Sequence, residues 1–514
     1  MFKIIFSYFR YLNFNKKFFK NDNKTNNIIL AEFPNLKSFA ISSSYFCHTL
    51  NEIHNAKTFL YFPNFLTFKD KLKYIFSLFN PFSTINIFKS FTKKIIIPNQ
   101  KLLSTEKEKK LEKYSKKIRN KWDLINLKYK NIQIGDLLYD EYLARFNVPT
   151  VEIESEHFKN FLSDSIKLLF FWEDFLSENN VKSLVLSHSV YIMGLVGRVG
   201  IAKDINVYVV APTSHYKLSK KQFIKWSDHM DYNHQFKKMK KNQQKYLLSQ
   251  ANKNIELRLS GKEDLRYKLA RPMTSVFKGK QIKKKSKMKL KKINILVAAH
   301  CFMDAPHVFG SLIFEDFFEW IYYLGKKSKD LKFKKKYKWF IKIHPSLYSR
   351  NKIHFENFIE KYPNFTLVGK NETHNNLINK IGIDYVLTVY GSIAHEYPLF
   401  GIPVINAGFN PHQGYNFSKT VNSIKDYDKI LSNLPKYKLK RDYKKEILEF
   451  YAMHHLIDYN FFEDLKIDFN LGLSDKLDVL CQFVNKTDNK IHNKKIDIYK
   501  RFIYSKERRL IKIN

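Results

Sequence analysis

The stretch from Trp339 to Gly408 constrains the fold of this chain more than any other part. Each of its three short apolar runs ends in a small or polar residue and precedes a helix-like segment; the runs are Trp339–Ile343, Tyr385–Val389 and Pro403–Ile405. Strands that alternate with helices of this length indicate a parallel sheet covered by helices on both faces. Ligands of such sheets bind beyond the carboxyl ends of the strands, where helix N-termini point. The stretch therefore predicts a ligand site for an anionic group.

Candidate binding residues follow two of these runs directly. His344-Pro345 ends the first, Gly391-Ser392 follows the second, and Glu396 comes one helical turn later. Gly391 lets the backbone approach a ligand closely, and Ser392 can cap a helix or bind a phosphate through its hydroxyl and N–H. A carboxylate does not favour a bare phosphate, so the expected partners of Glu396 are ribose hydroxyls.

A polar loop, AHCFMDAPHVFG, follows the expected strand Ile293–Ala298. His300, Asp304 and His307 in this loop have side chains that can ligate zinc or iron. A proline and the position after a strand argue against the helix that would align the three. A loop of donor side chains that leads into a helix, here expected from about Phe309 to Leu324, better suits phosphate or sugar hydroxyls. We therefore expect these residues to bind a ligand, and we expect no metal.

The first half of the chain shows the same alternation of strands and helices. A long helix-like run with three- and four-residue apolar spacing covers Phe158–Asn179. The expected strands are Asn27–Phe33, Thr58–Phe62, Ser183–Leu186 and Asn206–Val210. Both halves thus predict an α/β fold.

Three residues of the first half are candidate general bases. His188 stands between a strand and a helix, and its ordinary pKa lies near the working pH of an enzyme. It can serve as a base or hold the turn by hydrogen bonds. Asp136 and Asp140 are four residues apart in QIGDLLYDEY, so they share one face of a helix. They can act as base and orienter, or cap and solvate that helix.

Length and composition divide the chain. Its 514 residues are too many for a single core. The run KGKQIKKKSKMKLKK cannot form a core and indicates a linker, whereas Asn254–Arg266 predicts a loop. The expected parts are a basic aromatic N-terminal segment (1–26), an N-terminal domain (27–277), the linker (278–292), a C-terminal domain (293–432) and a helical, basic C-terminal extension (433–514).

The formal charge of +42, from 90 Lys and Arg against 48 Asp and Glu, attracts polyanions such as nucleic acid, acidic lipid or a phosphorylated substrate. The joint abundance of Lys, Asn, Ile, Phe and Tyr also fits A/T-biased coding sequence. A non-catalytic RNA- or membrane-binding protein is the alternative that charge alone supports, although RNA-binding motifs are absent. Three isolated cysteines indicate a reducing compartment and no disulfide framework.

The chain termini suggest contact with a membrane without a span. No run approaches the ~18 apolar residues of a transmembrane helix. The start, MFKIIFSYFRYLNFNKKFFK, can lie on an anionic membrane as an amphipathic helix or pack on its own domain. The last 40 or so residues are basic and irregular, which is typical of loosely ordered ends. We expect a cytoplasmic protein that can sit peripherally on the inner face of the cytoplasmic membrane.

Several motifs together resemble a known family. They are DAPH at Asp304–His307, KIHP at Lys342–Pro345 and YGSIAHEYPLFGIPVINAG at Tyr390–Gly408, with IGDLLYDEYL, LSHSVYIMGLVGRV and RLSGKED in the first half. The chain thereby resembles bacterial capsule and surface polysaccharide biosynthesis proteins, glycosyltransferases of GT-B type whose wider group includes Kdo transferases. The resemblance covers roughly residues 27 to 432.

The resemblance implies two Rossmann-like domains facing across a cleft, with the activated sugar on the C-terminal one. By analogy His344 and Ser392 would contact the nucleotide phosphates and Glu396 the ribose. Lys342 can add positive charge there, or bury its stem on the opposite face of its strand. Pro398 departs from a regular helix after Glu396 and predicts that this helix is kinked or short.

The resemblance further implies transfer from a nucleotide-activated sugar, with a CMP-linked donor as one option, to a surface-polysaccharide or lipid-linked glycan. No EX7E pair follows Glu396, because position 404 is valine; this favours inversion at the sugar carbon. We expect no cofactor besides the nucleotide-sugar co-substrate and no specific nucleic acid partner. Transfer of a polyol phosphate from a CDP carrier is the alternative within the same architecture.

Overall fold

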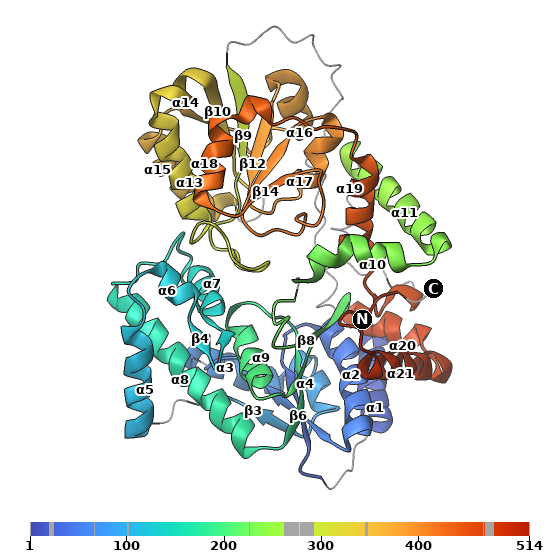
Figure 1. Cartoon of the computed structure of the whole chain (residues 1–514). Coiled ribbons are helices and arrows are strands. Elements are labelled where there is room, and N and C mark those ends of the chain that lie inside the picture. Colours follow the sequence, from blue (N-terminus) through green and yellow to red (C-terminus); the bar gives the residue numbers. More distant parts are fainter. Residues whose placement is uncertain are drawn as a thin grey trace.

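The computed structural model describes residues 2–19, 25–65, 67–99, 102–225, 227–261, 277, 292–344, 348–465, 467 and 477–512. Within these ranges the chain forms two α/β domains, each built on a six-stranded sheet (Figure 1). The prediction of two Rossmann-like domains is confirmed. Pro345 and all but the last residue of the expected linker 278–292 lie outside the described residues.

The N-terminal sheet has the order β3-β2-β1-β6-β7-β8, in which only β8 runs antiparallel to its neighbour. Side chains alternate between two cores, so that Leu30 packs on one face and Ile29 on the other. Strands β2 and β3 are added on one side of β1, and β6, β7 and β8 on the other side. The strands are β1 (Ile28–Glu32), β2 (Lys57–Tyr61), β3 (Lys94–Ile96), β6 (Val181–Leu186), β7 (Asn206–Ala211) and β8 (Ser214–Leu218).

The C-terminal sheet is parallel throughout, with the order β11-β10-β9-β12-β13-β14. Its strands are near-continuous apolar runs because helices cover both faces. The chain reverses its direction of travel between β9 and β12. The strands are β9 (Ile293–Ala298), β10 (Tyr337–Lys342), β11 (Phe365–Leu367), β12 (Tyr385–Thr388), β13 (Val404–Ala407) and β14 (Lys419–Val421).

Helices cover both sheets, and β4 (Lys128–Tyr129) with β5 (Ile132–Gln133) forms a small hairpin. In the first half the helices are α1 (Phe2–Phe18), α2 (Lys37–His54), α3 (Phe68–Phe79), α4 (Thr84–Lys89), α5 (Thr105–Lys116), α6 (Lys121–Ile125), α7 (Gly135–Phe146), α8 (Glu156–Glu178), the 3-10 turn η1 (Tyr191–Gly194), α9 (Leu195–Ala202), α10 (Tyr232–Lys238) and α11 (Lys241–Leu259). In the second half they are α13 (Phe317–Lys329), α14 (Leu331–Lys336), α15 (Tyr348–Lys361), α16 (His374–Asn376), α17 (Ile393–Glu396), the 3-10 turn η4 (Tyr397–Phe400), α18 (Ile424–Ser432), α19 (Lys444–Tyr451), α20 (Leu477–Lys486) and α21 (Asn489–Tyr504).

Helices from different expected parts of the chain pack together. Helices α10 and α11 lie beside α19 (Figure 1) and share a core with it, although their residues were assigned to the N-terminal domain. The segment 254–266, expected as a loop, is helical as far as Leu259. A helix with an apolar face needs a partner surface, and α19 provides it for both α10 and α11.

The two chain ends complete the N-terminal domain. Helix α1 packs on α20 with Tyr8 and Tyr11 buried, so this segment takes the alternative of a helix packed on its own domain. Helix α21 packs on α2, and Tyr45 of α2 bonds His492 of α21. The expectation of a loosely ordered C-terminus is therefore wrong for the described residues 477–512, because their apolar faces are buried.

Other differences between the expected and the observed elements have local causes. The helix expected from Phe309 begins only at Phe317, where Asp316 caps it by accepting a bond from the N–H of Glu319. Short edge strands such as β3 and β14 were not anticipated because three residues show no periodicity. Among the described helices, none is long and apolar enough to cross a membrane.

Candidate functional site

The ends of the central strands in both sheets form the candidate site. In the C-terminal sheet the loops after β9 and β12 flank the point where strand order reverses. In the N-terminal sheet the strand order reverses between β1 and β6, and Glu32 is the last residue of β1. Glu32 accepts hydrogen bonds from the N–H and the hydroxyl of Ser187, each at 2.7 Å. Burial raises the pKa of Glu32 to about 7, against the lowering effect of these bonds.

His300, in the loop after β9, holds the end of β12. Its ring stacks on Phe317 at 4.6 Å, and its Nε2 lies 3.3 Å from the backbone N–H groups of Val389 and Tyr390. Burial, with a smaller effect of His344, lowers the pKa of His300 to about 3, so the ring is neutral and accepts these bonds. His300 therefore supports the loop that was expected to bind phosphate.

The same loop is fixed by Tyr390, whose hydroxyl donates to the carbonyl of Ala305 at 3.1 Å. Gly391 follows, and a Cβ there would meet the hydroxyl of Thr388 at 2.9 Å. The loops after β9 and β12 are thus tied together, and Gly391 stands where a side chain does not fit.

An Asp–His pair joins the two domains. Nδ1 of His307, in the loop after β9, lies 2.6 Å from Oδ1 of Asp140 on α7, and the backbone N–H of His307 donates to Oδ2 at 3.3 Å. Both side chains are buried. Burial raises the pKa of Asp140 to about 6. Burial alone would lower the pKa of His307, but the charge and hydrogen bond of Asp140 outweigh it and raise that pKa.

This geometry decides the tautomer of His307. The carboxylate of Asp140 can only accept, so Nδ1 carries the proton and the lone pair of neutral His307 is on Nε2. Nε2 is buried and has no hydrogen-bond partner among the described residues. A buried acceptor without a partner costs free energy, which a substrate hydroxyl would recover. The pair therefore has the arrangement of a base and its orienting carboxylate.

His188 has the opposite arrangement. Its Nδ1 accepts a bond from the N–H of Ser189 at 3.1 Å, which puts the proton of the neutral ring on Nε2. Burial and the charge of Lys225 lower the pKa of His188 to about 4, while nearby Asp304 opposes them. A neutral His188 therefore has a proton rather than a lone pair on Nε2, and this tautomer does not suit proton abstraction.

Asp136 is held by Arg198 rather than exposed to a ligand. Nη2 of Arg198 lies 2.9 Å from Oδ2 of Asp136, and Nη1 donates to the carbonyl of Gln133. Both side chains of the pair are buried. Asp136 thus takes the structural alternative, and of the two aspartates on this helix face only Asp140 reaches the other domain.

Three further hydrogen bonds, made by two aspartates, join the domains. Asp304 accepts a bond from the hydroxyl of Tyr191 at 3.0 Å. The fully buried Asp316 accepts from the hydroxyls of Tyr139 and Thr150 at 2.5 and 2.6 Å. These contacts flank the Asp140–His307 pair and position it.

Glu396 is buried under the loop instead of facing open solvent. Its Oε1 lies 2.5 Å from Nε of Arg258, at the end of α11, and Nη2 of Arg258 lies 3.4 Å from the hydroxyl of Ser392. The carboxylate expected to bind ribose is thus already engaged by a guanidinium. Arg258 brings a positive charge next to Ser392, where an anionic ligand is expected.

Lys342 and His344, at the end of β10, lie in different surroundings. Lys342 is buried and donates from Nζ to the carbonyl of Glu372 at 2.8 Å; burial lowers its pKa. Its ammonium group is therefore held by that carbonyl, and its charge, with those of Glu396 and Arg258, acts on the ring of His374. His344 is exposed and lies close enough to His300 to lower the pKa of that ring.

Helix α17 is a single turn that continues as η4 through Pro398. The expected shortening is confirmed, and so short a helix contributes little dipole to anion binding. His300, Asp304 and His307 point to three different partners. Within the part of the chain that the structure describes, no three His, Cys, Asp or Glu side chains are grouped to hold a metal ion.

Four residues of this site were missed at the level of the sequence. The sequence does indicate Glu32, because a charged residue at the end of an apolar strand is a candidate for a site. Arg258 lies in the RLSGKED motif, but only the fold brings it to Glu396. Nothing in the sequence marked Tyr191 or Asp316.

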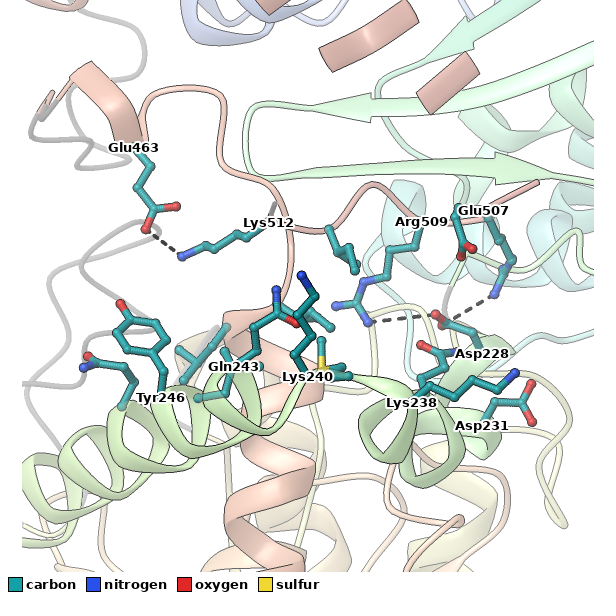
Figure 2. A pocket seen from close by; sticks show the side chains of 18 of the residues that line it. Asp228, Asp231, Lys238, Lys240, Gln243, Tyr246, Glu463, Glu507, Arg509 and Lys512 are labelled. Atoms are coloured by element: carbon teal, nitrogen blue, oxygen red, sulfur yellow. Dashed lines mark hydrogen bonds and ion pairs between the residues drawn. The ribbon is translucent and has the colours of Figure 1, made fainter. Parts of the chain in front are cut away.

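A cavity of about 610 Å³ lies between α10, α11 and the C-terminal tail, away from the Asp140–His307 pair. Figure 2 shows two of its cations facing carboxylates: Lys512 pairs with Glu463 at 2.6 Å, and Arg509 lies 3.9 Å from Asp228. Because its charges are largely matched, this cavity is a poorer anion site than the loop at Ser392.

Comparison with known families and curated proteins finds no match by sequence. Several solved structures share a distant likeness. KpsC of Thermosulfurimonas dismutans, a β-Kdo 2,4 transferase, is 10% identical with a TM-score of 0.32, over 53% of this chain and 79% of that one. A glycosyltransferase of Rickettsia africae is 12% identical with a TM-score of 0.23, over 93% and 99%. The wall teichoic acid polymerase TagF is 12% identical with a TM-score of 0.22, over 97% and 99%.

Proposed function

We propose that this chain is a glycosyltransferase that moves a sugar from a nucleotide-activated donor to a glycan acceptor. The observation that carries the proposal is the Asp140–His307 pair, which joins helix α7 to the loop after β9 across the two Rossmann-like domains. Its buried Nε2 has no hydrogen-bond partner among the described residues. Its orientation fits removal of a proton from an acceptor hydroxyl.

The donor would bind at the ends of β10 and β12. His344 and Ser392 would contact the phosphates, as the motif resemblance implies. Arg258 supports this assignment because its guanidinium already lies 3.4 Å from the hydroxyl of Ser392. A guanidinium next to the departing phosphate stabilises the charge that develops on it. Gly391 would let the nucleotide approach the backbone.

Transfer would be a single displacement. The acceptor oxygen attacks the anomeric carbon, its proton passes to Nε2 of His307, and the bond from that carbon to the phosphate oxygen breaks. The nucleotide leaves with the electron pair of that bond. Asp140 stabilises the imidazolium, as the raised pKa of His307 indicates. Such a displacement inverts the sugar carbon and needs no metal ion.

A CMP-linked sugar as donor and a surface-polysaccharide or lipid-linked acceptor are our proposals for the two substrates, and the cytoplasm is the proposed location. Transfer of a polyol phosphate from a CDP carrier would use the same cleft. Product mass distinguishes the two reactions, since only the second adds a phosphate.

A thermal-shift screen with CMP, CDP, UDP and GDP tests the donor site, because a ligand that binds only the folded protein raises its melting temperature. We expect one nucleotide to raise it in the wild type, and a smaller rise in Ser392→Ala and His344→Ala. No rise with any of the four, or equal rises in the variants, would contradict the proposed donor site.

A further inference from the structure

Helix α3 carries an apolar stripe that points away from the protein. Five large apolar side chains along it are exposed, by between 38% and 80%; they are Phe68, Leu72, Ile75, Phe76 and Phe79. Their spacing of i, i+4, i+7, i+8 and i+11 puts them on one face of the helix. A soluble helix normally buries such a face, so this one is suited to a partner.

The opposite face of α3 is the one that packs on the domain. Tyr74 lies on that face and contacts Phe62 at a ring distance of 5.4 Å. Thr67 and Asp70 form a reciprocal capping box that starts the helix. The helix is therefore anchored, and its outward orientation is set by packing and capping.

Charge surrounds the stripe. Lys69 and Lys73 flank it on one side and Lys71 on the other, whereas Asp70, the one acidic residue of α3, lies on the packed face. An apolar stripe between lysines is the pattern of helices that lie in the interface of an anionic membrane, where long lysine side chains reach the headgroups. The net charge of +42 favours the same partner.

A second apolar surface adjoins α3. Phe9 of α1 is exposed and lies 6.1 Å, between ring centroids, from Phe82, which follows α3 in the chain. Phe6, one turn before Phe9 in α1, is 71% exposed. Exposed apolar side chains thus also occur on α1, which contacts the chain just after α3.

The start of α3 leads toward the candidate site. A cavity of about 490 Å³ is lined by Thr67 and Lys71 of α3, Arg145 of α7 and Ile192 of η1. The first residue of η1, Tyr191, contacts Asp304 across the domains. An acceptor headgroup carried by the membrane could therefore enter from α3. Lys71 would meet its anionic part together with Arg145, which pairs with Glu141 at 2.7 Å, while Asp164 on the same lining would meet a hydroxyl.

We propose that α3, with its exposed apolar stripe, docks the protein on an anionic bilayer so that the 490 Å³ cavity receives a membrane-borne acceptor. The choice of acceptor rests on the proposed function; docking itself does not. A bilayer fits better than a second copy of the chain because the stripe is rimmed by lysines, which would repel each other in a symmetric pair.

Flotation of the full chain with vesicles of 70% phosphatidylcholine and 30% phosphatidylglycerol tests the docking. We expect the wild type to float at physiological salt, and Phe76→Ser/Phe79→Ser to bind roughly tenfold more weakly. Lys69→Gln/Lys71→Gln/Lys73→Gln should weaken binding to these vesicles too. The matched control is Leu331→Ser/Ile353→Ser, which changes two exposed apolar residues of the other domain and should float like the wild type.

Unchanged flotation of the Phe76→Ser/Phe79→Ser variant, or no flotation of the wild type, would overturn the proposal. A dimer in solution that this variant dissociates would overturn it as well, since a second copy would then cover the stripe. Because these side chains are exposed, melting temperatures should stay equal. Nucleotide binding in solution is measured separately, so failure of docking and failure of the proposed function are distinguishable.

Discussion

Nδ1 of His307 and Oδ1 of Asp140 lie 2.6 Å apart although 167 residues separate them in the chain and they belong to different domains. The base and its orienting group thus meet only when the two domains are together. Catalysis that depends on this pair depends on the interdomain contacts at Asp304 and Asp316 as well.

Asp140→Asn should change the pH profile as well as the rate. The carboxylate raises the pKa of His307, so its loss should lower that pKa and move the acidic limb of kcat/KM to lower pH. We also expect kcat/KM to fall by roughly 10²–10⁴, because an amide can favour the wrong tautomer. Rates measured from pH 5 to 9 decide this, and a smaller rate with an unmoved limb would indicate a structural role only.

Arg258→Gln should destabilise the fold. It removes the guanidinium that pairs with the buried carboxylate of Glu396, which costs about 3–5 kcal/mol. Arg258→Met/Glu396→Leu removes both charges and should regain most of that loss. Thermal unfolding of the two variants checks this; a double variant less stable than Arg258→Gln would contradict the pairing.

Gly391→Ala should weaken nucleotide binding by roughly tenfold, about 1.4 kcal/mol. The added Cβ would meet the hydroxyl of Thr388 at 2.9 Å and displace the loop. Gly369→Ala is the matched control, because a Cβ there meets nothing within 4 Å. Titration of both variants with the nucleotide found by thermal shift provides the comparison, and equal affinities would exclude a close approach at Gly391.

The free energy of unfolding should decrease as the pH rises from 5 to 7, in part because of Glu32. Burial raises its pKa from 4.5 to about 7, so over this range the folded state keeps a proton that the unfolded state has lost. Stability therefore decreases as pH rises. Glu32→Gln removes this proton, and its melting temperature should decrease less from pH 5 to 7 than that of the wild type.

Turnover should not need a metal ion, since the proposed displacement uses Arg258, Ser392 and His344 for the leaving phosphate. EDTA should leave the rate of transfer unchanged. Loss of activity with EDTA and recovery with Mg²⁺ would contradict this prediction.

The framework of the fold was accessible from the sequence for a physical reason. Buried parallel strands such as β9 and β12 are continuous apolar runs, and a run of this kind ends where the chain leaves the core. His188, His344 and Gly391 could therefore be assigned to strand ends. Edge strands and the boundary at α10 depend on tertiary packing, which leaves no periodic signal.

The pairing of side chains was not accessible. Asp140 and His307 were each selected, but for different roles, since nothing in a sequence shows which residues meet between domains. Glu396 was assigned to ribose because its partner Arg258, 138 residues away, could not be foreseen. Likewise, the sequence of α3 has the pattern of an ordinary amphipathic helix with a buried apolar face, so the exposure of that face could not be foreseen.

The most direct test compares transfer by His307→Gln and His188→Gln, each supplied with the nucleotide-sugar whose nucleotide stabilises the wild type. We expect His307→Gln to lose roughly 10²–10⁴ of kcat while the nucleotide still raises its melting temperature. His188→Gln should keep a larger share of kcat, because its imidazole presents an N–H rather than a lone pair. A nearly unchanged kcat in His307→Gln, with loss in His188→Gln, would show that the base is not the Asp140–His307 pair.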